Sequence, residues 1–415
     1  MSSGSALGHA FTLAAGPILT RIYGPEEFGA LGLFTTLISI LGVAITLQYE
    51  ISIVGGRDES EAAYLTFGSL LFAVPVSTLA GVLLWLLIRT SSFGFGNLPW
   101  FTPPLLAISM AFIGFFTALR YWSLRAGQFG KIAQGTFVQS AGRSVFQTTI
   151  GAVGFHSSGL LIGETLGRCI GMSSMIRSSW PVLKRNAMQF RLDEFGRVLW
   201  RYRKFPLYSF PSSFLNALCL GLPLPLLIRM YGVSLGGYYS LVWKAITVPG
   251  LVITVAVADT FHGRLARCAR DTPDGVMHLF RLTSLGLVIT GSIPAVILWF
   301  WGQPLFGLIF GPRWALSGTI ASIVAPWYLA QFVVGPLSRA AIVLSGQEMK
   351  LLWDVLCLVS LVAVFYVAHS RGLASLQTIR MLSGVYTLLF FAYYLILVHI
   401  VGRFIKSRNA TTQVT

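Results

Sequence analysis

Charged residues are scarce in this sequence. They make up 11% of its 415 residues, against roughly 25% in soluble domains. Hydrophobic residues reach 55%, and the mean hydropathy is +0.73. Apolar runs of about 20 residues can each span a bilayer as a helix, and such runs recur along the whole chain. We therefore expect an all-α polytopic membrane protein and not a water-soluble globule.

Cysteine and catalytic motifs are scarce as well. The four cysteines have no metal-ligand or redox spacing, and the six histidines are scattered, so we expect small apolar packing residues and no metal site or cofactor. There is no G-x-x-x-x-G-K-[ST] phosphate loop and no H-E-x-x-H motif, and no outer loop is large enough for a catalytic domain. These absences favour a transporter over an enzyme.

Twelve apolar runs are long enough to cross a bilayer, with short polar connections between them. The first run lacks a basic segment before it and precedes a polar turn, so we expect a retained span and not a signal peptide. The predicted spans are residues 3–19, 28–48, 63–88, 101–119, 132–154, 157–176, 208–228, 234–260, 282–302, 317–344, 350–369 and 380–402.

The net charge of +16 follows the predicted topology. If the N-terminus is cytoplasmic, 21 of the 30 Lys and Arg residues lie in cytoplasmic connections, six lie on the outer side and three lie inside spans. This asymmetry agrees with the positive-inside rule. It predicts a membrane protein with both termini in the cytoplasm, and it explains the basic charge without nucleic acid.

One short motif occurs twice. "PILTRIYG" begins at Pro17, and "PLLIRMYG" follows it at an offset of 208, which aligns Arg21 with Arg229 and Tyr23 with Tyr231. Six spans separate the copies, an even number, so the two halves have the same orientation. We predict a parallel repeat of two six-helix lobes with the substrate site between them. Chance similarity between two Tyr-Gly turns is the alternative.

The predicted domains are an N-terminal lobe at residues 1–176, a basic cytoplasmic linker at 177–207 and a C-terminal lobe at 208–415. The linker contains "LDEFGRVLWRYRKFP", whose apolar residues lie near one face of a helix among basic residues. Such a segment favours contact with anionic lipids of the cytoplasmic leaflet. A linker that is basic only because of the positive-inside rule is an equal alternative.

Four charged residues stand out deep inside predicted spans, where insertion of a charge costs about 2.5–3.5 kcal/mol. They are Arg143, Glu164, Arg168 and Lys244. Cations that face a central cavity suit an anionic substrate, and the guanidinium fork of arginine suits phosphate in particular. The alternative for each residue is a charge pair that holds helices together. This alternative has most weight for Arg168, which follows Glu164 by four residues on one helix.

The sixth span also has glycines at strict four-residue intervals. This pattern indicates a stripe on which another helix packs closely. The stripe consists of Gly159, Gly163, Gly167 and Gly171.

Several stretches resemble the bacterial oligosaccharide flippases, which are polysaccharide-biosynthesis transporters of the multidrug/oligosaccharidyl-lipid/polysaccharide exporter superfamily. They are "GSALGHAFTLAAGPILTRIYGPEEFGALGLF", "YEISIV", "FPLYSFPSSFLNALCLGLPLPLLIRMYG" and "LFGLIFGPRWALSGTIASIVAPWYLAQFVVGPLSRAAIVLSGQ". The resemblance extends over essentially all twelve spans. It implies two lobes that open alternately to the two sides. Between them an undecaprenyl-pyrophosphate-linked oligosaccharide would pass to the outer leaflet of the bacterial cytoplasmic (inner) membrane, for O-antigen or exopolysaccharide synthesis.

The resemblance also implies motif positions and partners. Arg21, Tyr23, Tyr49, Glu50 and Lys244 occupy motif positions, and a polysaccharide polymerase and glycosyltransferases are the implied partners. Members often have arginine before the Tyr-Glu pair, where this chain has glutamine. If that arginine holds phosphate in relatives, another arginine must substitute for it here, or the head group differs.

We predict two groups of functional residues. The predicted substrate-binding residues are Gln48, Arg143, Glu164, Arg168 and Lys244, and the predicted gating or motif residues are Arg21, Tyr23, Tyr49, Glu50, Arg229 and Tyr231. A multidrug exporter of the same superfamily is the first alternative function and would be supported by an acidic cavity. A membrane polymerase or ligase would require a large outer loop, and a purely structural scaffold would not explain central cations.

Overall fold

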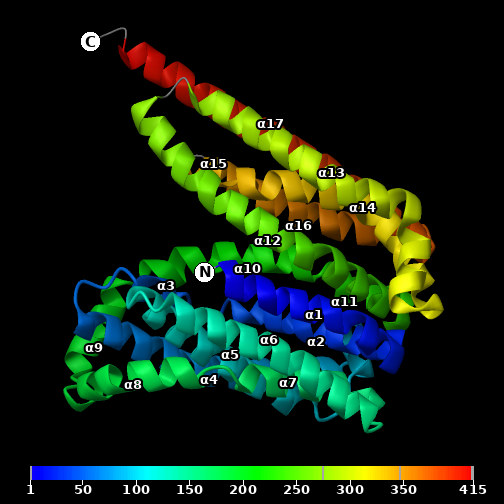
Figure 1. Ribbon diagram of the computed structural model, residues 1–415, viewed down its shortest axis with the longest axis horizontal. Coiled ribbons are helices and arrows are strands. Elements are labelled where there is room, and N and C mark those ends of the chain that lie inside the picture. Colours follow the sequence, from blue (N-terminus) through cyan, green and yellow to red (C-terminus); the bar gives the residue numbers. More distant parts are fainter. Residues whose placement is uncertain (1, 273–274, 345–346, 413–415) are drawn as a thin grey trace. The chain divides into compact units, whose positions relative to one another are not determined.

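The protein is a multi-pass, all-α membrane protein, as predicted. The computed structural model describes residues 2–272, 275–344 and 347–412, and in these ranges it contains helices and no strand (Figure 1). Helices satisfy every backbone hydrogen bond within one segment, which is why apolar chains adopt them in lipid. The chain divides into two compact units, Met1–Ser240 and Leu241–Thr415.

In its described residues the first unit contains eleven α-helices before α12, which leads out of it, and two irregular segments. They are α1 (Ser2–Ile22), α2 (Pro25–Gly42), α3 (Tyr49–Ile53), α4 (Glu59–Arg89), the 3₁₀ segment η1 (Ser92–Asn97), α5 (Thr102–Arg125), α6 (Phe129–Ala152), α7 (His156–Cys169), α8 (Ser173–Met188), α9 (Leu192–Arg201), the π segment η2 (Phe205–Ser209), α10 (Phe210–Gly221) and α11 (Pro223–Tyr231). Within this unit α6 packs against α1 and α7, and α4 packs against α5.

The second unit begins within a long helix that starts in the first. Its elements are the greater part of α12 (Val233–Asp271), α13 (Gly275–Phe310), the 3₁₀ segment η3 (Pro312–Trp314), α14 (Ala315–Leu337), α15 (Arg339–Val343), α16 (Gln347–Ser370) and α17 (Ser375–Thr412). Helix α14 packs against both α13 and α17.

Local sequence signals explain where helices begin. Helix α2 has Pro25 at its first position, directly after Gly24, whose N–H donates to Glu27 Oε2 at 2.9 Å. Asp58 caps α4 by accepting the N–H of Glu61 at 2.7 Å. Proline at the first helical position and a carboxylate at the N-cap both suit the unsatisfied N–H groups there. The turn between α1 and α2 is therefore short.

All twelve predicted spans overlap helices, but fewer helices are both long enough and apolar enough to count as a membrane span by themselves. In the described residues, seven helices are long and apolar enough to cross a membrane, and Ala10–Ile22 is a shorter apolar helix. The predicted sixth span is interrupted, because α7 ends at Cys169 and Gly171 has a φ of +88° before α8 begins. The total of twelve spans therefore stays a prediction.

The predicted lobe boundaries differ from the boundary between the two units. Residues 208–240, which the sequence assigns to the C-terminal lobe, have their contacts in the first unit: α10 packs against α2, and α11 packs against η1 and α2. The predicted linker at 177–207 consists largely of the helices α8 and α9. The lobe boundaries themselves stay a prediction.

The apolar face of α9 packs on α4. A Cβ atom added to Gly68 of α4 would lie 2.8 Å from a Leu199 methyl group and 3.6 Å from the Phe195 ring. Arg201, at the end of α9, forms an ion pair with the buried carboxylate of Glu61. Protein thus covers Phe195 and Leu199 on the apolar side of the basic linker helix, whereas Leu192 and Trp200 stay exposed.

The repeated motif leads into two helices that contact each other reciprocally. A Cβ atom added to Gly29 in α2 would lie 2.2 Å from the carbonyl oxygen of Val233, and one added to Gly237 in α12 would lie 1.7 Å from that of Pro25. The offset of 208 relates Gly29 to Gly237 and Pro25 to Val233. Each glycine therefore lets the partner helix approach at the equivalent point.

Other contacts between α2 and α12 join two residues that occupy the same position in the two copies of the repeat. Ser234 Oγ donates to Glu26 Oε1 at 3.1 Å, and a Cβ atom added to Gly32 would lie 3.0 Å from Ser240 Cβ. Both pairs are separated by 208 residues. Contacts between equivalent residues fit a local two-fold relation between α2 and α12, and the parallel repeat of two lobes stays a prediction.

Candidate functional site

Two of the predicted intramembrane cations share one carboxylate in the first unit. Arg143 Nη1 in α6 lies 3.2 Å from Glu164 Oε1 in α7, and Arg168 Nη2 lies 2.6 Å from the same oxygen. The Glu164 side chain is only 6% exposed. The predicted pairing of Glu164 with Arg168 along one helix is confirmed, and Arg143 joins it from the neighbouring helix.

The glycine stripe allows this close approach of α6 and α7, as predicted. A Cβ atom added to Gly167 would lie 2.1 Å from Arg143 Cγ, and one added to Gly163 would lie 2.6 Å from the backbone nitrogen of Gln147. Because no side chain stands between the helices at these two turns, the Arg143 guanidinium reaches the carboxylate on the other helix.

Two glutamine side chains flank these three charged residues. Gln147 Nε2 lies 3.4 Å from Glu164 Oε2 and donates to the Leu160 carbonyl oxygen at 3.2 Å. On the other side, Gln139 Nε2 donates to the Arg168 carbonyl oxygen at 3.1 Å. These amides make hydrogen bonds where water is scarce, so they stabilise buried charges.

The cluster has one more cation than anion. Arg168 Nε is buried and has no hydrogen-bond partner among the described residues. The Arg143 side chain is 28% exposed, against 18% for Arg168. The Arg168 guanidinium is therefore held by Glu164 on its own helix, and the Arg143 guanidinium is the more exposed of the two. Substrate binding by either residue stays a prediction. We call Arg143, Glu164 and Arg168 the charge cluster.

Tyr23 connects the first copy of the repeated motif to this region. It is fully buried, and its hydroxyl group donates to the Gln147 carbonyl oxygen at 2.7 Å. Burial, and secondarily the charge of Glu27, raises the pKa of Tyr23 to about 12. The hydroxyl group therefore stays protonated and fixes the turn between α1 and α2 against α6.

The other motif residues at the outer turns are less enclosed. Arg21 is exposed at the last turn of α1. Arg229 is also exposed, with its guanidinium carbon 5.5 Å from the Phe93 ring centroid, and Tyr231 is half-buried. A gating role for these residues stays a prediction.

The residues of the "QYE" motif have their partners elsewhere. Gln48 has a φ of +64° before α3, and its Nε2 donates to the Val43 carbonyl oxygen at 3.3 Å. Tyr49 donates to the Leu199 carbonyl oxygen at 3.2 Å, which ties α3 to α9. These partners lie in the α2–α3 loop and in α9, not in α6 or α7.

Glu50 is buried without a cationic partner among the described residues. Its Oε2 accepts a hydrogen bond from Thr46 Oγ1. Burial raises the pKa of the Glu50 carboxyl group above its ordinary value, and the threonine bond opposes this only in part. Glu50 is thus a buried glutamate whose environment is opposite to that of Glu164.

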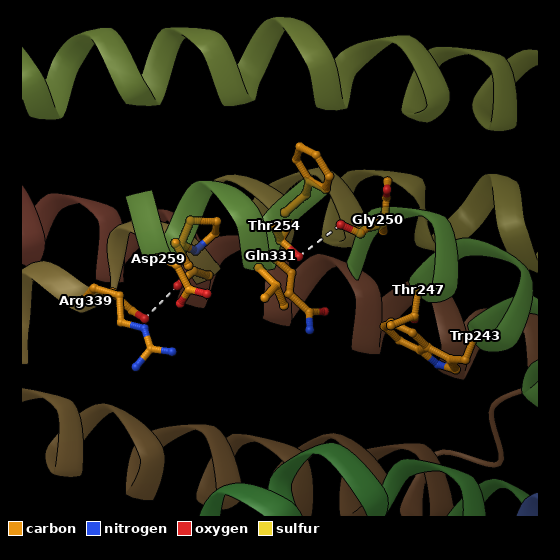
Figure 2. A pocket seen from close by; sticks show the side chains of 14 residues that line it. Trp243, Thr247, Gly250, Thr254, Asp259, Gln331 and Arg339 are labelled. Carbon is orange, nitrogen blue, oxygen red and sulfur yellow. Dashed lines mark hydrogen bonds between the residues drawn. The ribbon is translucent and has the colours of Figure 1, made fainter. Parts of the chain in front are cut away.

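Lys244 is half-buried in α12 and belongs to the second unit. It follows Trp243, which lines a cavity of about 370 Å³ between α12 and α14 (Figure 2). The polar side chains that line this cavity are Thr247, Thr254, Asp259, Gln331, Ser338 and Arg339. We call it the α12–α14 cavity.

Sequence reasoning missed this cavity. One face of α12 can be recognised from intervals of four, three and four residues. Its members are Trp243, Thr247, Gly250 and Thr254. This face of small and polar residues inside an apolar helix was the available signal. Among the described residues no group of three or more His, Cys, Asp or Glu could hold a metal ion.

Comparison with known proteins identifies relatives in sequence. A family model described as "Polysaccharide biosynthesis protein" matches residues 18–318. The chain is 23% identical over 355 residues to the succinoglycan biosynthesis transport protein ExoT of Rhizobium meliloti (strain 1021). The match covers 81% of this chain and 66% of ExoT, so the chain spans slightly less than two thirds of that relative's length.

Solved structures with a similar fold are transporters. One is an inward-facing multidrug resistance MATE family transporter of the MOP superfamily, with a TM-score of 0.77 and 14% identity over 98% of this chain and 96% of that chain. Another is a MOP superfamily transporter from Pyrococcus furiosus, with a TM-score of 0.63 and 14% identity over 97% and 95%. At these identities the likeness concerns the fold alone.

Proposed function

This chain belongs to the polysaccharide biosynthesis protein family, and from that premise we propose that it is a flippase for a lipid pyrophosphate-linked oligosaccharide. It moves the sugar unit, carried on an undecaprenyl lipid, from the inner to the outer leaflet of the bacterial cytoplasmic membrane. The relative ExoT, named for succinoglycan transport, favours exopolysaccharide over O-antigen as the product.

The observation that carries the proposal is the surplus cation of the charge cluster. Glu164 neutralises one positive charge, but two guanidinium groups lie within 3.2 Å of it. In a segment of low dielectric constant the remaining charge attracts an anion more strongly than it would in water. The partly exposed guanidinium of Arg143 offers two parallel N–H donors to a phosphate group.

We assign different tasks to the members of the cluster. Arg143 binds a phosphate oxygen of the head group while Glu164 holds its guanidinium, and Arg168 fixes the Glu164 carboxylate in place. Lys244 contributes a further cation from α12. Gating by the turns at Arg21 and Arg229 completes an alternating-access cycle in which the lipid tail remains in the membrane.

Two kinds of enzyme are the expected partners of this function. The enzymes that supply and consume the substrate are glycosyltransferases on the cytoplasmic side and a polymerase on the outer side. We propose anionic lipids as a further partner, in contact with the exposed part of the linker. Leu192 and Trp200 are exposed there, and the guanidinium carbon of Arg203 lies 3.9 Å from the Trp200 ring centroid.

Mass spectrometry of lipid extracts from the native host tests the proposal. We expect a pyrophosphate-linked oligosaccharide to accumulate when the protein is depleted and when it is replaced by Arg143→Gln, because the variant lacks the phosphate-binding cation. Arg143→Lys should retain part of the function because it keeps the charge but not the fork. Arg371→Gln, at an exposed arginine between α16 and α17, is the matched control and should prevent accumulation like the native protein.

The same strains separate the alternative functions. Absence of accumulation on depletion, together with greater sensitivity to lipophilic cations, would favour the multidrug exporter. Accumulation on depletion but not with Arg143→Gln would keep the flippase and return Arg143 to a structural role.

A further inference from the structure

We propose that the α12–α14 cavity is a subsite for uncharged sugar residues of the transported oligosaccharide, distinct in its ligand from the phosphate-binding charge cluster. This inference rests on the proposed function, because it names the part of the substrate that the second unit recognises. The cavity volume of about 370 Å³ falls within the range of about 300–1,000 Å³ that is typical of small-molecule sites.

One wall of the cavity is aromatic. It consists of Trp243, Tyr328 and Phe332. The rings of Trp243 and Trp327 are 4.7 Å apart at 76°, an edge-on packing that holds the Trp243 indole in one orientation. The C–H groups of a pyranose ring carry a small positive charge and pack against the negative face of an aromatic ring. A fixed indole on a cavity wall therefore suits a sugar ring.

The other walls present neutral hydrogen-bonding groups, which Figure 2 shows along α12 and beside Gln331. Gln331 Oε1 has no hydrogen-bond partner among the described residues. The terminal torsion of a glutamine side chain is broad, so the amide can turn to present either its oxygen or its nitrogen to a ligand. Thr254 Oγ1 donates to the Gly250 carbonyl oxygen at 3.0 Å, and Thr247 places a second neutral hydroxyl group on the same wall. Sugar hydroxyl groups both donate and accept, and they match such groups.

The charges of the cavity are balanced. Asp259 and Arg339 both line it, both are exposed, and in the described part of the chain no ion pair joins them. A site with one carboxylate and one guanidinium has no net attraction for a pyrophosphate or for a lipophilic cation. Both groups are strong hydrogen-bonding partners for hydroxyl groups. Charge balance therefore favours a neutral, hydroxyl-rich ligand over either alternative.

The test compares two lipids on the full-length protein in nanodiscs. The first probe is the lipid pyrophosphate-linked oligosaccharide extracted from depleted cells, and the second is undecaprenyl pyrophosphate, which carries no sugar. We expect Gln331→Leu to weaken binding of the glycosylated lipid about tenfold, equivalent to about 1.4 kcal/mol, and to leave binding of the sugar-free lipid unchanged. Arg143→Gln should weaken binding of both lipids.

Further variants keep the inference falsifiable if Gln331→Leu does not fold. Thr247→Val removes a hydroxyl group at nearly constant volume, and Trp243→Ala removes the aromatic wall while Trp243→Phe keeps it in part. Both Thr247→Val and Trp243→Ala should weaken binding of the glycosylated lipid alone. Trp301→Ala, at an exposed tryptophan of α13, is the control and should change neither affinity.

Several results would overturn the inference. One is that the cavity variants weaken binding of both lipids equally or weaken binding of neither. A second is that the native protein binds the sugar-free lipid as tightly as the glycosylated lipid. A third is that the native protein binds tetraphenylphosphonium and that Asp259→Asn abolishes this binding. Each of these results is compatible with accumulation of lipid-linked oligosaccharide on depletion. Failure of the cavity is thus distinguishable from failure of the proposed function, which absence of accumulation alone would indicate.

Discussion

The charge cluster and the α12–α14 cavity are two polar regions inside apolar helices, and they are built in opposite ways. In the cluster, glycines bring α6 and α7 so close that one carboxylate contacts two arginines. In the cavity, aromatic side chains line an open volume with neutral polar groups. The first arrangement concentrates positive charge, and the second offers hydrogen bonds without net charge. The contrast suggests that a substrate with an anionic part and a sugar part is recognised in two places.

The largest effect is expected from removing the shared carboxylate. Glu164→Gln leaves two guanidinium groups facing each other in a buried site, and loss of one partner of a buried ion pair costs about 3–5 kcal/mol. We expect a lower yield of folded protein and a lower midpoint of thermal unfolding, measured by size-exclusion chromatography of heated samples. The double variant Glu164→Gln/Arg168→Gln should recover part of the loss. A single variant as stable as the native protein would mean that the pairs do not hold the helices together.

The same substitution, glycine to alanine, should act differently in the two regions. In Gly167→Ala the new methyl group would lie 2.5 Å from the Arg143 Cα atom, so α6 and α7 must separate, and overpacking of this kind costs about 1–3 kcal/mol. In Gly250→Ala it would lie 2.9 Å from the Tyr328 hydroxyl oxygen, the end of a side chain that can shift, and we expect a cost below about 1 kcal/mol. Thermal unfolding of both variants checks this order. Equal costs would contradict the difference in packing.

The smallest expected effect concerns Glu50, which is buried without a cationic partner among the described residues. Because burial raises the pKa of Glu50 in the folded protein, the folded state keeps a proton that the unfolded state releases as pH rises above the ordinary glutamate value. Stability should therefore fall over the interval from that ordinary pKa up to the folded pKa, with a slope of at most about 1.4 kcal/mol per pH unit for one group. Glu50→Gln should remove this fall, which thermal unfolding over a pH series measures. A Glu50→Gln variant that loses stability at neutral pH would indicate that the ionised carboxylate has a partner.

The sequence predicts helices better than it predicts their contacts. The twelve apolar runs all overlap helices, the spacing of Glu164 and Arg168 allows the pair that the structure contains, and the glycine interval predicts close packing of the sixth span. Arg143 was recognised as a costly charge, but hydropathy does not determine which neighbouring helix faces it. Its partner on α7 therefore required the structure.

The α12–α14 cavity was harder to predict, for a different reason. Its residues come from two helices separated by α13, and each residue has an ordinary role when taken alone. Gln331 lies within a predicted span that contains other small and polar residues, and Asp259 lies near the predicted cytoplasmic end of its span. Only the packing of α14 beside α12 brings them to one cavity.

Transport by the purified protein tests the central claim most directly. The lipid pyrophosphate-linked oligosaccharide from depleted cells is incorporated into both leaflets of proteoliposomes, and a lectin added outside measures the accessible fraction over time. We predict that the native protein makes the inner pool accessible and that Arg143→Gln slows this, whereas Arg371→Gln does not. Accessibility that rises no faster than in protein-free vesicles, in the same preparation that exports tetraphenylphosphonium, would contradict the flippase and support a drug exporter.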